Sequence, residues 1–220
     1  MHESESVRVI VVLPTGRSGY FGPDEYGITW QVRQAIRVAG RISPGAGVDV
    51  VLYGEPADGR SADGGIAVRM RVEPEFLEKW AGEWGTISDA GGLSFLEDRR
   101  PATRVERVFA VGSSSMSRPL VALGEVTAIL REAPGPTLVL FQLDSRLQEA
   151  EVVLAIRAAG QKAVFWQLFG WRHSIGESFW IQGGMYRGRV LPNLAVHFSA
   201  NWSDRAVTRR FTRWRKKALV

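Results

Sequence analysis

The run VRVIVVL, Val7–Leu13, is an almost unbroken series of β-branched and aliphatic residues. A strand with one face in water alternates apolar with polar residues, whereas a strand of a covered parallel sheet is apolar on both sides. The run therefore predicts a strand that is buried on both faces of a parallel sheet. Further runs that predict strands lie at residues 48–53, 105–111, 137–143 and 162–169.

Segments with helical periodicity separate these runs. Apolar residues recur at helical spacing from Ile28 to Ala39, and Gly40 then interrupts the pattern. Pro119–Arg131 and residues 145–160 show the same periodicity between later strands. Alternating strands and helices predict an α/β fold with a Rossmann-like, mostly parallel sheet built from two βαβ halves.

The residue composition and pattern change along the chain, and these changes indicate its domain organisation. A chain of 220 residues forms one large domain or two small ones. Glycine-rich alternation after residue 170 predicts a β-hairpin at one edge of the sheet. The predicted α/β domain covers residues 1–202, with halves at about 7–53 and 105–169, a turn-rich connector at 54–104 and the edge hairpin at 170–202, and a basic helix follows at 203–220.

Two loops at corresponding places, in VVLPTGRSG and VFAVGSSSMSRP, combine glycine and hydroxyl residues with one arginine. Loops that follow parallel strands meet at the carboxyl edge of the sheet, where backbone amides, helix N-termini, hydroxyls and guanidinium groups suit an anion. The candidate ligand-binding residues are Thr15, Gly16, Arg17, Ser18, Gly112, Ser113, Ser114, Ser115 and Arg118. We expect Arg17 and Arg118 to face one crevice.

The same residue types also form ordinary strand-to-helix turns, and this alternative stays open. Neither loop matches a Walker motif or the GxGxxG fingerprint, so no nicotinamide or other cofactor is predicted.

The segment RVFAVGSSSMSRPLVALGEVTAILREAPGPTLVLFQLDSR resembles the second half of SAVED domains, which are relatives of the CARF sensors of bacterial defence systems. The resemblance covers about 40 residues well and extends loosely, through the repeat, over about 140. It implies two Rossmann-like halves that bind a cyclic oligonucleotide, with the residues of the two loops lining the pocket. It also implies an effector subunit or self-assembly. The chain departs from the family in having no attached effector segment, and its basic C-terminal stretch is not typical of the family.

Residues suited to catalysis or metal binding are sparse. The chain has no cysteine, and its histidines, His2, His173 and His197, do not have the spacing of a metal site. His173 lies in a segment without a GxSxG motif. Asp144 follows a predicted strand and suits either a ligand contact or a helix cap. We therefore predict no catalytic residue and no metal, and a nucleotide-processing hydrolase that uses Asp144 is a third functional alternative.

Positive charge is concentrated at the C-terminal end of a chain whose net charge is +5. The apolar residues of the predicted helix share one face: Val207, Phe211, Trp214 and Ala218. Its cations are Arg205, Arg209, Arg210, Arg213, Arg215, Lys216 and Lys217. Three interpretations stay open: docking of the apolar face on the domain, contact with nucleic-acid phosphates, or contact with an acidic partner or membrane surface.

No apolar run reaches the roughly 20 residues of a membrane span, and the acidic N-terminus MHESESVRV does not resemble a secretion signal. These features predict a cytoplasmic protein. The leading interpretation is a binding module that senses a phosphorylated nucleotide, such as a cyclic oligonucleotide, in bacterial defence or signalling. The alternative is a structural or regulatory nucleic-acid-binding protein that uses its basic C-terminal helix.

Overall fold

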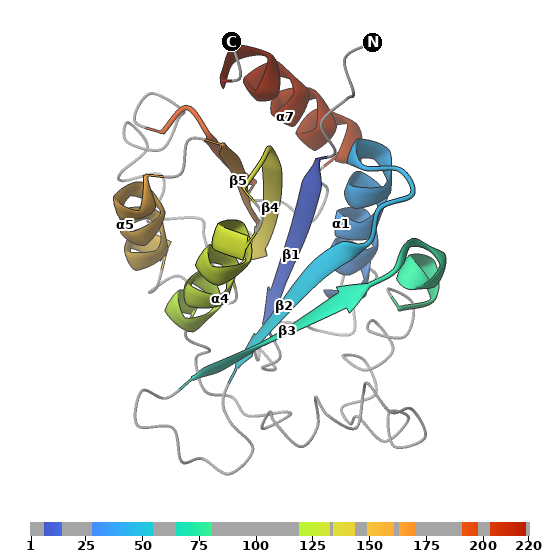
Figure 1. Ribbon diagram of the computed structural model, residues 1–220, viewed down its shortest axis with the longest axis horizontal. Coiled ribbons are helices and arrows are strands. Elements are labelled where there is room, and N and C mark those ends of the chain that lie inside the picture. Colours follow the sequence, from blue (N-terminus) through green and yellow to red (C-terminus); the bar gives the residue numbers. More distant parts are fainter. Residues whose placement is uncertain are drawn as a thin grey trace.

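A computed structural model shows a central sheet with helices on both of its faces (Figure 1). It describes residues 7–14, 28–54, 65–80, 119–132, 134–143, 149–160, 163–169, 191–197 and 203–218. In this part of the chain, no helix is long and apolar enough to cross a membrane.

The described residues form a sheet of six strands in the order β3-β2-β1-β4-β5-β6. The strands are β1 (Arg8–Pro14), β2 (Val48–Gly54), β3 (Ile66–Val72), β4 (Thr137–Gln142), β5 (Val164–Phe169) and β6 (Leu194–His197). β3 pairs antiparallel with β2, and all the other pairings are parallel. The predicted α/β class with a Rossmann-like, mostly parallel sheet is therefore confirmed.

In the described part of the chain, helices cover both faces of the sheet (Figure 1). Helices α1 (Ile28–Ile42) and α7 (Asp204–Ala218) lie on one face, and α4 (Pro119–Glu132) and α5 (Glu149–Ala159) lie on the other. A short 3₁₀ helix, η1 (Pro74–Phe76), follows β3. The chain thus forms three layers, with a hydrophobic core on each side of the sheet.

The first strand shows why its sequence is apolar without interruption. Val9 and Val11 pack in the core that α1 and α7 cover, whereas Ile10 and Val12 pack beneath α4 and α5. All four side chains are at most 1% exposed. Successive side chains of a strand point to opposite faces, so burial on both sides requires the unbroken run of β-branched and aliphatic residues.

The winding of the chain reverses between β1 and β4, which are neighbours in the sheet. The chain leaves β1 through α1 to reach β2 on one side, and it leaves β4 through α5 to reach β5 on the other. Because α1 and α5 cover opposite faces, the connections that follow β1 and β4 diverge at this point. In open α/β sheets, such a topological switch point is where ligands bind, outside the carboxyl ends of the strands.

The sequence did not predict β3, which lies inside the segment expected to be a connector, 54–104. The strand at 105–111 and most of the hairpin at 170–202 lie outside the described residues. Strand β6, which lies in the described part of the segment predicted as a hairpin, pairs in parallel with β5. The predicted C-terminal helix is confirmed as α7.

Candidate functional site

The two predicted ligand-binding loops, at residues 15–18 and 112–118, lie outside the described residues, but the elements that hold them are described. The first loop follows Pro14, the last residue of β1, and the second precedes Pro119, the first residue of α4. Near the other end of α4, the carbonyl oxygen of Ile129 accepts a hydrogen bond from Arg8 at the start of β1. The N-terminus of α4 therefore lies toward the carboxyl edge of the sheet, where β1 ends.

Pro14 and Pro119, the described residues that border the two loops, thus lie toward the same edge of the sheet. The side chains of Arg17 and Arg118 are not described, so their common crevice stays a prediction.

Gln142, the last residue of β4, is a polar side chain in this region that the sequence reasoning missed. It is fully buried, and neither Nε2 nor Oε1 of its amide has a hydrogen-bond partner among the described residues. Leu138 and Leu140 belong to the core beneath α1 and α7, so strand alternation places the side chain of Gln142 on that face. A buried amide without partners costs about 1–3 kcal/mol, which marks the position as one where a polar ligand group would be stabilised.

A hydrogen bond spans the switch point on the opposite face of the sheet. The Tyr53 hydroxyl at the end of β2 donates to the main-chain carbonyl of Gln142 at 2.7 Å, and its ring packs against Phe141 at a centroid distance of 5.8 Å. Because β1 lies between these two strands, the Tyr53 side chain reaches across the end of β1. It therefore fixes the relative positions of the strand ends that border the candidate site.

A second buried glutamine, Gln167 in β5, lies on the same face as Gln142 but is largely satisfied. It pairs with Leu140, which belongs to the core beneath α1 and α7. Its Nε2 donates to the carbonyl oxygens of Leu168 and Ala195, and the second of these bonds ties β5 to β6. Gln167 thus has a structural role that Gln142 lacks, although Oε1 of Gln167 is also without a partner among the described residues.

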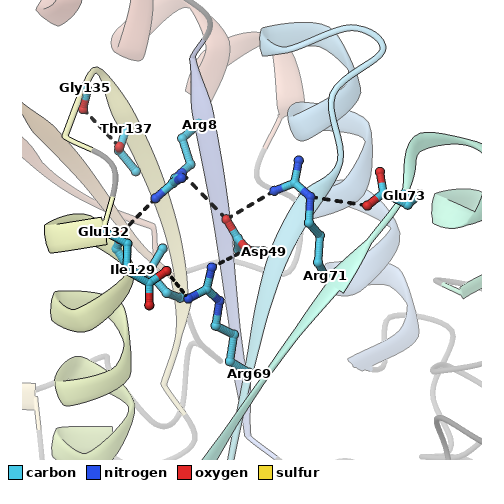
Figure 2. A network of polar contacts seen from close by, with 9 residues as sticks. All are labelled: Arg8, Asp49, Arg69, Arg71, Glu73, Ile129, Glu132, Gly135 and Thr137. Atoms are coloured by element: carbon cyan, nitrogen blue, oxygen red, sulfur yellow. Dashed lines mark hydrogen bonds and ion pairs between the residues drawn. The ribbon is translucent and has the colours of Figure 1, made fainter.

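The densest polar network lies near the amino edge of the sheet, away from these strand ends (Figure 2). At its centre is Asp49 of β2, which is fully buried. Its Oδ2 lies 3.7 Å from Nε of Arg8 and 3.6 Å from Nη1 of Arg71, and its Oδ1 lies 3.3 Å from Nη2 of Arg69. One carboxylate on β2 is therefore surrounded by guanidinium groups from β1 and β3.

Two glutamates complete this Asp49 network. Glu132 at the end of α4 pairs with Arg69, and Glu73 pairs with Arg71 at 3.3 Å. The hydrogen bond to Glu132 raises the pKa of Arg69, with a smaller opposing effect of burial, so this guanidinium stays protonated. Each cation thus faces at least one carboxylate, which indicates that the network joins the strands and α4 and does not form a ligand site.

Catalytic and metal-binding candidates gain no structural support. Within the described ranges, no group of three or more histidine, cysteine, aspartate or glutamate residues could hold a metal ion. His2, His173 and Asp144 lie outside these ranges, and His197 is the last residue of β6. The prediction of a hydrolase that uses Asp144 is therefore untested.

The C-terminal helix packs on the sheet through its apolar face. Val207, Phe211 and Trp214 are buried, and the two aromatic rings contact Phe165 of β5 at centroid distances of 6.1 and 5.5 Å. Ala218, which was expected on the same face, is exposed at the end of the helix. Arg215 is half-buried, and the other six predicted cations of the helix are exposed. The apolar face of α7 is thus docked on the domain, as the first of the three interpretations predicted.

These features define the class of the protein as a doubly wound, Rossmann-like α/β protein with a switch point between its first and fourth strands. No protein-family model matches the chain, and no curated protein matches its sequence. The fold is similar to the crystal structure of the conserved hypothetical protein BatB from Bacteroides thetaiotaomicron, with a TM-score of 0.53 and 12% sequence identity. The match covers 96% of this chain and 100% of the other, and at this identity it supports the fold alone.

Proposed function

We propose that the protein binds a phosphorylated nucleotide at the carboxyl edge of its sheet, above the boundary between β1 and β4. The observation that carries the proposal is the buried amide of Gln142, which has no hydrogen-bond partner among the described residues and lies at the end of β4, next to the switch point. Ligand sites of Rossmann-like sheets lie at this position, and buried amides without partners are rare in native proteins.

The chemistry of the surrounding sequence suits such a ligand. Arg17 and Arg118 supply guanidinium groups for phosphates, and the glycine and serine residues of both loops supply backbone amides and hydroxyls. The Gln142 amide offers a donor and an acceptor side by side, which match the edge of a nucleobase or a ribose hydroxyl. The proposal therefore assigns phosphate recognition to the loops and recognition of the nucleoside to Gln142.

The resemblance to SAVED domains narrows the ligand class to cyclic oligonucleotides. In this form of the proposal, the protein acts as a cytoplasmic sensor, and an effector subunit or a second copy of the chain receives the signal.

A thermal-shift screen against mononucleotides and cyclic di-, tri- and tetranucleotides tests the proposal. A ligand that binds only the folded state raises the melting temperature by about 5 °C or more when it is present at about one hundred times its dissociation constant. We expect such a shift with at least one phosphorylated nucleotide and none with the matching nucleoside. No shift with any nucleotide at micromolar concentration would reject the proposal.

Substitution of Gln142 by leucine separates the effect of this residue on the stability of the free protein from its effect on nucleotide binding. We expect Q142L to stabilise the free protein by about 1 kcal/mol, because a buried amide without partners is replaced by an apolar side chain of similar size. The same variant should lose most of the nucleotide-induced shift. Chemical denaturation measures the first effect, and the thermal-shift titration measures the second.

The matched control is Q167L, on the same face of the neighbouring strand. It removes two hydrogen bonds and should destabilise the protein by about 1–2 kcal/mol while preserving the nucleotide-induced shift. If Q142L keeps the full shift, the nucleotide binds elsewhere on the protein.

A further inference from the structure

The two helix layers differ sharply in charge. Helix α1 contains three arginines and no acidic residue, and α7 contains seven arginines and lysines and one acidic residue, Asp204. That carboxylate is paired with Arg41 of α1 at 2.8 Å. On the other face, the described side chains of α4 and α5 include three glutamates and two arginines. The helices on one face of the sheet, α1 and α7, are therefore strongly basic, whereas the described side chains of α4 and α5 are nearly balanced in charge.

The cations on α1 and α7 form an outward-facing ridge along each helix. In α7, Arg205, Arg209 and Lys216 lie opposite the buried side chains of Val207 and Phe211. All three cations are exposed, as is Arg213 beside them.

The ridge of α1 is built in the same way. Arg33 and Arg37 are exposed and lie opposite the buried Ala35 and Ala39. Helices α1 and α7 are in contact, and the start of α7 lies beside the end of α1 (Figure 1), so the two rows of cations adjoin in one basic surface. We call this surface the basic ridge, and it consists of Arg33, Arg37, Arg205, Arg209, Arg213 and Lys216.

Within the described part of the chain, no carboxylate pairs with the cations of the basic ridge. Among the described residues, none of the six side chains forms an ion pair, whereas the arginines of the Asp49 network are each paired with carboxylates. A cation in the last turn of a helix is favoured by the helix dipole, which accounts for Lys216 without any ligand. The dipole does not account for Arg33, Arg205 or Arg209, which lie far from the last turns of their helices.

We propose that the basic ridge binds the phosphate backbone of a nucleic acid. Residues three or four apart on a helix have Cβ atoms about 5–6 Å apart, and the 15 residues of α7 extend over about 22 Å. The ridge therefore presents a row of regularly spaced cations, which suits a long, regularly charged polyanion. Five of its six cations are arginines, which bind phosphates through two parallel hydrogen bonds.

Burial of the apolar residues of α7 argues for a nucleic acid over a membrane surface. A helix that lies in a membrane interface inserts its apolar face between the lipids. In α7 that face is already occupied, because Val207, Phe211 and Trp214 pack in the core of the protein. Among the described residues, the exposed side of α7 carries its cations, and guanidinium and ammonium groups suit phosphates.

The basic ridge and the proposed nucleotide site lie at different places on the fold. Helix α1 connects two parallel strands and therefore ends near the amino edge of the sheet, where Arg41 meets the first residue of α7. The nucleotide site lies at the carboxyl edge. A nucleic acid on the ridge is thus independent of the nucleotide, and either proposal can fail without the other.

A binding experiment with two charge-matched variants of the full chain tests this inference. The ridge variant carries R209Q, R213Q and K216Q. The control carries K79Q, R131Q and R157Q, which remove the same charge from exposed positions outside α1 and α7. Fluorescence anisotropy with labelled single-stranded and double-stranded RNA and DNA of random sequence gives the affinity at several salt concentrations. Thermal melting confirms that both variants are folded.

We expect the unaltered chain and the control to bind nucleic acid with a strong salt dependence. The ridge variant should bind about 100-fold more weakly at about 0.1 M salt, and its slope of log K against log salt should be smaller by about 2, since each phosphate contact contributes about 0.7–0.9. The RNA and DNA arms show which backbone is preferred. An equal loss in both variants, an absence of binding to every nucleic acid, or binding to anionic vesicles alone would overturn the proposal.

Discussion

Replacement of Phe211 by alanine is expected to lower the free energy of unfolding by about 3–5 kcal/mol, the usual cost of truncating a buried aromatic side chain. Phe211 is 2% exposed and contacts Phe165 and Trp214. The loss should appear in urea or guanidinium denaturation followed by tryptophan fluorescence or circular dichroism. It would establish that the basic C-terminal segment is part of the core and not an appended arm.

The matched control is R213A on the exposed side of the same helix. A surface substitution of this kind changes stability by no more than about 0.5 kcal/mol. If F211A lowered the free energy of unfolding by no more than R213A does, the packing of the aromatic residues of α7 on β5 would not stabilise the protein.

This packing also determines how nucleic-acid binding can be tested. Deletion of residues 204–220 would remove the partners of Phe165 and expose the core beneath α7. A loss of binding in such a truncated chain would therefore not distinguish a lost contact from a lost fold. Substitutions of basic-ridge residues leave the core beneath α7 intact, because the side chains of the basic ridge are exposed.

The sequence predicted most reliably those elements that are buried on both faces. The run at β1 has no other simple interpretation, because seven consecutive residues that are almost all apolar cannot be covered on one side only. The edge strand β3 was missed although its sequence, IAVRMRV, alternates. The turn-rich segments around it determined the interpretation of residues 54–104 as a connector.

The sequence pattern was less informative about the polar groups. Gln142 stands in the apolar run TLVLFQ, so its burial could have been inferred, but whether its amide finds a partner among the described residues depends on the packing. Asp49 likewise stands among apolar residues, while its arginine partners come from strands that only the sheet topology brings together. Pairing of groups far apart in the chain depends on topology, which residue periodicity does not specify.

Two of the interpretations of the C-terminal helix are compatible with each other, namely docking of its apolar face on the domain and contact of its charged side with nucleic-acid phosphates. Docking of the apolar face occupies Val207, Phe211 and Trp214, and it orients the charged side away from the core. The sequence showed this amphipathic pattern but not that α1 lies beside α7 with a second row of arginines. The proposed nucleic-acid surface therefore depends on the contact between two helices that are more than 160 residues apart in the chain.

Replacement of Asp49 by asparagine is expected to reduce the free energy of unfolding by about 3 kcal/mol, near the lower end of the cost of breaking a buried ion pair. The substitution keeps the shape of the side chain but leaves Arg8, Arg69 and Arg71 around a neutral amide. The cost is at the lower end because these arginines are between 24% and 49% exposed and stay partly hydrated. Denaturant unfolding of both proteins measures the difference.

Position within the network, and not charge alone, should decide the size of this effect. E73Q removes a carboxylate that is 52% exposed and pairs with Arg71, and such surface pairs contribute about 0–1 kcal/mol. Salt at about 1 M should abolish the small effect of E73Q while leaving most of the effect of D49N, because ions screen exposed pairs far more than buried ones. Equal losses in the two variants, or a D49N effect that disappears in salt, would mean that burial of Asp49 adds nothing to the junction of β1, β2 and β3.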